Sequence, residues 1–390
     1  MSKANESPHV ATAQRIAREV AGPQAASVDR DARFPREALD ALKEARLLSA
    51  FVPKSMGGLG LGMIELSQMC EALAQHCAST GMVFAMHQIQ VACLVRHANG
   101  VGFFERYLKE LAAKQYLIAS VTSEVGVGGE MRTSICAVEK SGDRFKLDKD
   151  ASTISYGEHA DDLLVTARAT PDATPNDQAL VLVSKPDYSL ERTGAWDTLG
   201  MRGTCSPPFK MRSTGATERI LPAPFADIAS QTMVPFSHIL WASCWLGIST
   251  AAVSKARAFV RNQARSKPGQ TPPSAMRLAE VATQLQMMRA NVHDVASECE
   301  YLMNHPESSI DVLSSVAFAV KMNNLKVSTS EAAFQIAHRC LGICGIMGYK
   351  NDSKFSIGIH LRDSMSAALM VSNDRILSTN AAMLLVLKDD

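Results

Sequence analysis

Apolar residues recur at helical spacing near both ends of the chain. Between Glu65 and Ala78, one helical face collects apolar side chains: Leu66, Met69, Cys70, Leu73 and Cys77. Between Ala275 and Met303, apolar residues recur at intervals of three and four in the same way. This spacing is typical of helices with one buried face. The pattern therefore predicts helices from about residue 11 to 115 and again from about residue 235 onward.

The pattern changes between residues 117 and 228. Short apolar runs rich in β-branched residues, such as 163–166, 179–183 and 209–211, are separated by clusters of Gly, Pro, Asp and Asn. Such runs predict short strands joined by turns. Residues 268–273 form a Pro/Gly-rich turn between two long helical patterns, which favours an antiparallel bundle. We expect three domains: helical 1–115, β-rich 116–228 and helical 229–390.

Composition favours a soluble globular protein. The 390 residues are 46% apolar and 20% charged, with a formal net charge of +1. No basic surface for nucleic acid is expected. The longest weakly polar run, 239–253, is shorter than the roughly 20 residues of a membrane-spanning helix. Residues 1–7 contain no apolar signal core. We expect a cytoplasmic protein without a membrane segment.

The nine cysteines do not form a framework of paired spacings. They are spread from Cys70 to Cys344, and the close pair Cys340 and Cys344 has no second pair at zinc-site spacing. We therefore expect a reducing compartment, with neither disulfides nor a bound metal.

Five motifs follow one another along the chain. They occupy residues 123–130 (Ser-Glu-Val-Gly-Val-Gly-Gly-Glu), 154–161, 199–204, 341–349 and the closing stretch 361–376 with its Arg362-Asp363 pair. Their sequences and order, over roughly residues 15 to 388, resemble the acyl-CoA dehydrogenase family. The resemblance implies an α+β fold with an N-terminal helical domain, a β-barrel-like middle domain and a C-terminal four-helix bundle.

The resemblance also implies the cofactor and its residues. FAD is expected between the β domain and the bundle, completed by a second subunit of a homodimer or homotetramer. The residues implied to contact the flavin are Ser123, Gly128, Gly129, Ser155, Gly342, Gly345 and Asn373. Hydrogen-bond donors at the flavin stabilise the charge that it gains on reduction, and glycines let backbone amides approach closely. Thr153 departs from the family, which usually has tryptophan there.

Residues 261–268 replace the family's Arg-x-x-Phe-Gly motif, which grips the FAD pyrophosphate across the subunit interface. Arg265 is the first candidate to supply this charge and Lys267 the second, because cationic side chains bind phosphate. A solvated helix end is the structural alternative.

The usual catalytic base is missing. The family's glutamate corresponds to Val371, and its alternative location corresponds to Ser237, so neither position holds a carboxylate. His238 and Asp374 are candidate substitutes, although a lone histidine is often structural and Asp374 has an adjacent arginine.

His87 aligns with the helix that roofs the substrate pocket. The resemblance to flavin monooxygenases of this fold implies a catalytic role for it in the reaction of reduced flavin with oxygen; a pocket-lining or core histidine is the structural alternative.

Three functions remain open at this stage. The first is oxidation of an acyl thioester, on coenzyme A or an acyl carrier protein, by α-proton removal and β-hydride transfer to flavin N5. It requires an electron acceptor and a substitute base. The second is a monooxygenase that receives reduced flavin from a separate reductase and needs no α-base. The third is a non-catalytic flavin-binding protein.

Overall fold

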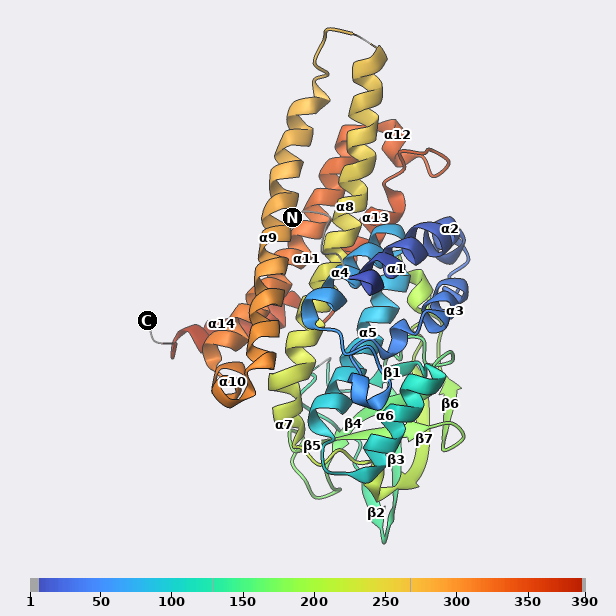
Figure 1. Cartoon of the computed structure of the whole chain (residues 1–390), viewed down its shortest axis with the longest axis vertical. Helices are drawn as coiled ribbons and strands as arrows, with labels where there is room; N and C mark the ends of the chain where they lie inside the picture. The colour runs from blue at the N-terminus through green and yellow to red at the C-terminus, as the bar shows by residue number, and fades with distance from the viewer. Residues whose placement is uncertain (1–6, 129, 267, 388–390) are drawn as a thin grey trace.

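The computed structural model describes residues 7–128, 130–266 and 268–387. Helices form both ends of the chain, and two small sheets lie between them (Figure 1). One large apolar core runs through all three regions. The predicted order of an N-terminal helical domain, a β-containing middle domain and a C-terminal helical domain is confirmed.

The N-terminal domain is built around α5. This helix carries apolar or small residues on nearly every side and is buried along most of its length, as expected for a helix without a polar face. Helices α3, α4 and α6 contact it, and α1 packs on the outer side against α4. The helices are α1 (Pro8–Ile16), α2 (Gly22–Arg30), α3 (Arg36–Glu44), α4 (Met63–His76), α5 (Ala78–His97) and α6 (Gly102–Lys114), with η2 (Ala17–Ala21) between α1 and α2 and η3 (Leu47–Ser49) after α3.

Two sheets form the middle domain. One has the strand order β1-β4-β5, with β1 parallel to β4, and the other is the antiparallel sheet β2-β3-β7-β6. Strand β4 is apolar and buried on both faces, whereas β3 and β7 alternate exposed and buried residues because only one of their faces meets the core. The strands are β1 (Ile118–Val121), β2 (Glu139–Ser141), β3 (Arg144–Ala151), β4 (Asp162–Arg168), β5 (Gln178–Ser184), β6 (Tyr188–Arg192) and β7 (Phe209–Ala216).

Three long helices dominate the C-terminal domain. Helices α8 and α9 form a hairpin whose tip projects away from the sheets, and α11 packs beside them (Figure 1). Shorter helices complete the bundle and lead to the end of the chain. The helices are α7 (Phe225–Ile228), α8 (Val234–Ser266), α9 (Ser274–Asn304), α10 (Pro306–Leu313), α11 (Val316–Cys344), α12 (Ile346–Tyr349), α13 (Gly358–Met365) and α14 (Asn373–Leu384), with η7 (Ala229–Met233) before α8.

Two helical stretches, Ala78–His97 and Phe225–Ser266, are long and apolar enough to span a membrane by length and composition. In each, 89% of the apolar window is buried inside the protein. Their composition is therefore accounted for by the core of the fold.

Arg362 and Asp363 of α13 join the three domains. Asp363 Oδ1 accepts a hydrogen bond from the Met201 amide of the middle domain at 2.6 Å. Arg362 Nε donates to the Leu199 carbonyl at 3.0 Å, and its guanidinium pairs with Asp29 of α2. One dipeptide thus ties the bundle to both other domains.

Gly200 permits this approach. A Cβ atom at this position would lie 2.2 Å from the Arg362 carbonyl oxygen, so any larger residue would push α13 away from the turn. The 199–204 motif noted in the sequence is therefore the surface on which α13 docks.

Burial raises the pKa of Asp363 to about 7, although the Met201 amide opposes the shift. The folded protein therefore holds this proton more tightly than the unfolded chain does. Stability contributed by the protonated carboxyl is present at low pH and is lost as pH rises from about 4 to about 7.

We predict that Asp363→Asn makes unfolding less sensitive to pH in this window. The side-chain oxygen of asparagine can still accept the hydrogen bond from the Met201 amide, but the side chain does not ionise. The free energy of unfolding of the variant, relative to wild type, should rise by up to a few kcal/mol between about pH 4 and about pH 7. Urea unfolding at several pH values measures it. If the difference in the free energy of unfolding between the variant and wild type stayed constant or fell over this range, the raised pKa of Asp363 would be wrong.

Candidate functional site

The loop after β1 contains the 123–130 motif and is called the motif loop below. A buried ion pair holds it in place. Glu124 accepts hydrogen bonds from the amides of Ile135 and Cys136, at 3.0 and 2.7 Å, which closes the loop on itself. Lys149 of β3 lies 3.6 Å from Glu124, and both side chains are almost completely buried. Removing one partner would leave a buried charge, so this pair fixes the loop firmly against the sheets.

Ser123 and Ser155 lie on two segments that meet at this loop. Ser123 Oγ donates to the Thr153 carbonyl at 2.6 Å and accepts from the Thr153 amide at 3.1 Å. Ser155 Oγ accepts from Ser206 Oγ at 2.9 Å, which leaves its own hydrogen free to donate. Ser123 therefore packs against the segment that carries Ser155, and of the two hydroxyls that the resemblance assigns to the flavin, Ser155 is the one with an available donor.

The segment between α13 and α14 meets the same loop. Arg375 of α14 donates a hydrogen bond to the Gly128 carbonyl. Just before it, Val371 has a φ of 48°, an unfavourable value for a β-branched residue. Such a backbone persists only where its surroundings hold it. Gly129, also assigned to the flavin, lies outside the described residues.

Asn373 and Lys326 hold this connection. Lys326 of α11 is completely buried and donates from Nζ to Asn373 Oδ1 at 2.6 Å. Asn373 Nδ2 donates to Ser330 Oγ at 3.0 Å. The Lys326 ammonium also lies 5.8 Å from the centre of the Trp245 ring, within reach of a cation–π interaction. Burial lowers the pKa of Lys326 to about 8. Asn373 is thus oriented by a buried cation.

His238 of α8 lies on the same buried side of the bundle. Its Nδ1 is 3.1 Å from the Met322 carbonyl, so this nitrogen carries the proton. Burial, reinforced by the charge of Lys326, lowers the pKa of His238 to about 4. At neutral pH its Nε2 is therefore an unprotonated acceptor. Two buried indole donors on α8, Trp241 Nε1 and Trp245 Nε1, have no hydrogen-bond partner among the described residues.

The positions of the usual base hold no proton acceptor of suitable strength. Val371 has an aliphatic side chain, and the Ser237 hydroxyl donates to the Met233 carbonyl at 2.5 Å within its own helical segment. Asp374 is exposed on α14 and points to no partner among the described residues. The structure thus brings His238 to the buried region and leaves Asp374 at the surface.

His87 is a core histidine, which was the structural alternative to a catalytic role. The Ile118 amide donates to its Nδ1 at 3.1 Å, which leaves Nε2 to donate to the Leu48 carbonyl at 2.8 Å. Both nitrogens are therefore engaged with the backbone. The side chain is fully buried, and burial lowers its pKa to about 4. His87 joins α5 to η3 and β1 and offers no free nitrogen to a substrate.

Three residues assigned to the flavin lie far from the sheets. Arg265 is exposed near the end of α8, at the projecting tip of the hairpin (Figure 1). Gly342 and Gly345 lie at the end of α11, where Gly345 has a φ of 56°. Gly342 lines a pocket of about 410 Å³ together with several polar side chains: Arg277, Glu280, His338 and Arg339. The protomer alone does not unite these residues with Ser123 and Ser155.

Sequence reasoning missed Lys326 and Lys149. A signal was available for Lys326, because it stands four residues from Met322 and from Ser330 on the face of α11 that is otherwise apolar or small. A lysine on a buried helical face needs an unusual partner, here an asparagine. For Lys149, the signal was the alternation along β3, which puts it on the same face as Phe145 and Leu147.

Comparison with known proteins gives the family. The model of the acyl-CoA dehydrogenase N-terminal domain matches residues 5–115, and that of the C-terminal domain matches residues 228–374. Together they cover about two thirds of the chain. The chain belongs to the acyl-CoA dehydrogenase family. The resemblance inferred from the five motifs is confirmed.

Relatives within the family have different chemistries. Mitochondrial isovaleryl-CoA dehydrogenase from Pongo abelii is 25% identical over 362 residues, covering 90% of this chain and 82% of that protein. FMN-bound TdsC from Paenibacillus sp. A11-2, a dibenzothiophene monooxygenase, has a TM-score of 0.84 at 19% identity, covering 97% of both chains. Butyryl-CoA dehydrogenase from Megasphaera elsdenii has a TM-score of 0.83 at 17% identity, covering 98% of this chain and 100% of that one. The two solved structures share the fold of this chain.

We predict that His87→Leu destabilises the fold by about 1–3 kcal/mol, because it leaves the Ile118 amide buried without an acceptor. Urea unfolding measures the change. His338→Leu, at an exposed position on α11, is the matched control and should change stability by less than about 0.5 kcal/mol. If His87→Leu kept full stability and lost activity, the structural role assigned to His87 would be wrong.

Proposed function

We propose that this chain is a flavin-dependent monooxygenase of the acyl-CoA dehydrogenase family, which receives reduced flavin from a separate reductase. The observation that carries the proposal is the composition of the buried site. The interior of the bundle holds the Lys326 ammonium and two indole N–H groups, the half-buried Ser155 hydroxyl lies in the middle domain, and position 371 is a valine. Such a site stabilises negative charge and lacks the carboxylate that removes an α-proton.

The residues present fit a flavin at the junction of the sheets and the bundle. Ser155 has a hydroxyl hydrogen to donate, and the buried indole donors of Trp241 and Trp245 lack partners among the described residues. The loop around Gly128 is fixed by the Glu124–Lys149 pair and by Arg375. When bound, a flavin supplies the electron transfer that no side chain here provides.

FAD is the form of flavin that we propose. Arg265 and the end of α11 lie at the far end of the bundle from the sheets, so they can serve only the flavin of a neighbouring copy (Figure 1). We therefore propose a homodimer or homotetramer whose subunits complete one another's sites. Mass spectrometry of the released cofactor distinguishes FAD from FMN.

The chain's own residues have three tasks in this proposal. Ser155 donates a hydrogen bond toward the flavin. Lys326 and Asn373 hold the α13–α14 connection, which carries an aliphatic residue, Val371, where the family usually has a carboxylate. The Lys326 charge favours any negative charge that develops in the site, because attraction is strong where water is excluded.

A dehydrogenase acting on an acyl thioester of coenzyme A or a carrier protein is the second candidate. It is favoured by His238, whose Nε2 is unprotonated at neutral pH and could accept an α-proton. Isovaleryl-CoA dehydrogenase also matches 90% of the chain. An electron acceptor would then replace the flavin reductase as partner.

We predict that acyl thioesters of coenzyme A and of acyl carrier protein leave the absorbance of the bound oxidised flavin unchanged without oxygen. With reduced flavin supplied, oxygen uptake should depend on an organic substrate. Anaerobic absorbance spectroscopy and an oxygen electrode measure the two reactions. Rapid bleaching by any thioester would overturn the monooxygenase proposal in favour of the dehydrogenase.

His238→Gln separates the two candidates further. Glutamine can keep a hydrogen bond to the Met322 carbonyl but is not a base. In a monooxygenase we expect oxygen uptake within a few-fold of wild type. In a dehydrogenase, loss of the general base should slow flavin bleaching by about a hundredfold or more.

A further inference from the structure

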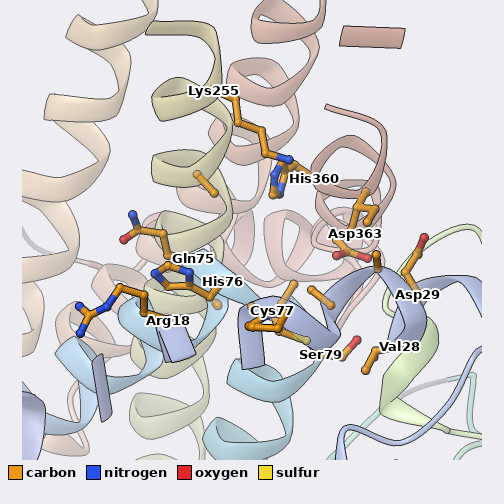
Figure 2. A pocket seen from close by; sticks show the side chains of 18 residues that line it. Arg18, Val28, Asp29, Gln75, His76, Cys77, Ser79, Lys255, His360 and Asp363 are labelled. Atoms are coloured by element: carbon orange, nitrogen blue, oxygen red, sulfur yellow. The ribbon is translucent and has the colours of Figure 1, made fainter. Parts of the chain in front are cut away.

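A second polar cavity lies where α13 meets the N-terminal helices. Its volume is about 460 Å³, and its walls come from η2, α2, the α4–α5 junction, α8 and α13. Figure 2 shows Lys255 and His360 on one side, facing Cys77 and Ser79 across the cavity, with Asp29 and Asp363 at its edge. It shares no lining residue with the proposed flavin site.

Lys255 gives the cavity a cation without a counter-ion. Its Nζ donates to the Ser356 carbonyl at 2.9 Å, and it forms no ion pair among the described residues. Burial lowers the pKa of Lys255. The two carboxyl groups at the edge are already engaged, Asp29 with Arg362 and Asp363 with the Met201 amide. The group that Lys255 lacks is an anion.

Two buried atoms of the lining have no hydrogen-bond partner among the described residues: His360 Nε2 and Asp29 Oδ1. Burial, with the nearby charge of Lys255, lowers the pKa of His360 to about 3, so its ring is neutral. A carboxylate oxygen such as Asp29 Oδ1 accepts hydrogen bonds only. Leaving such atoms unpaired is costly, so the lining favours a ligand with a hydrogen-bond donor group.

We propose that this cavity binds a small hydroxycarboxylate, with its carboxylate on Lys255 and its hydroxyl donating to Asp29 Oδ1. His360, which lies beside Lys255, forms a hydrogen bond with the ligand through Nε2. The N-terminal end of α5, at Cys77 and Ser79, adds the positive end of a helix dipole to the opposite wall. This site does not depend on the proposed function, since its lining contains no residue assigned to the flavin.

The test uses L-malate as the hydroxycarboxylate, succinate as the matched probe without a hydroxyl, and inorganic phosphate as the other anion. Isothermal titration calorimetry is run on the purified full chain, with and without flavin. We expect saturable binding of malate, with succinate weaker by about tenfold or more, as expected for the loss of one hydrogen bond to a charged group. Binding of phosphate in place of malate would overturn the carboxylate assignment.

Two variants test whether malate binds in this cavity. Lys255→Met removes the cation, and Ala251→Leu fills space from the α8 wall without changing any charge. Each should weaken malate binding by about tenfold or more. Lys109→Met, at an exposed position on α6, is the control and should bind as wild type does. The proposal would be overturned if wild type did not bind malate, or if Ala251→Leu bound it as tightly as wild type does. If Lys255→Met does not fold, the result for Ala251→Leu alone tests the proposal.

Discussion

The joint made by Arg362 and Asp363 determines how the three domains sit together. The buried Asp363 carboxyl accepts a hydrogen bond from the Met201 amide. Arg362 donates a hydrogen bond to the Leu199 carbonyl and forms an ion pair with Asp29. From this joint the chain enters the segment that contains Val371 and continues into α14. The position of that segment over the middle domain therefore depends on a contact outside the candidate site.

Buried cations recur at the candidate site. Lys149 braces the motif loop through Glu124, and Lys326 orients Asn373 from the opposite side. Taking either charge out of water is expensive, and the two are compensated differently: Lys149 by a carboxylate, Lys326 by an amide oxygen and an aromatic face. The incomplete compensation of Lys326 leaves a positive field in a region where Val371 provides no opposing charge. This unbalanced positive charge is the physical basis for proposing that the site stabilises negative charge on a flavin.

Much of the fold could be predicted from the sequence, because the helical period in 65–78 and 275–303 and the short apolar runs of the middle region follow directly from burial. The convergence of Ser123 and Ser155 was expected from their motifs. A core position was one of the alternatives for His87, but its partners could not be predicted, because the Leu48 carbonyl and the Ile118 amide are backbone groups far away in the chain. For the same reason sequence alone did not reveal Lys326, whose role depends on Asn373 forty-seven residues away.

The central claim is that the site favours negative charge on its flavin. The most direct measurement is the dissociation constant of the oxidised and of the anaerobically reduced flavin, for wild type and for Lys326→Met. The account predicts that wild type binds the reduced form more tightly and that Lys326→Met loses most of this preference. Tighter binding of oxidised flavin by wild type, or a preference unchanged in Lys326→Met, would contradict it.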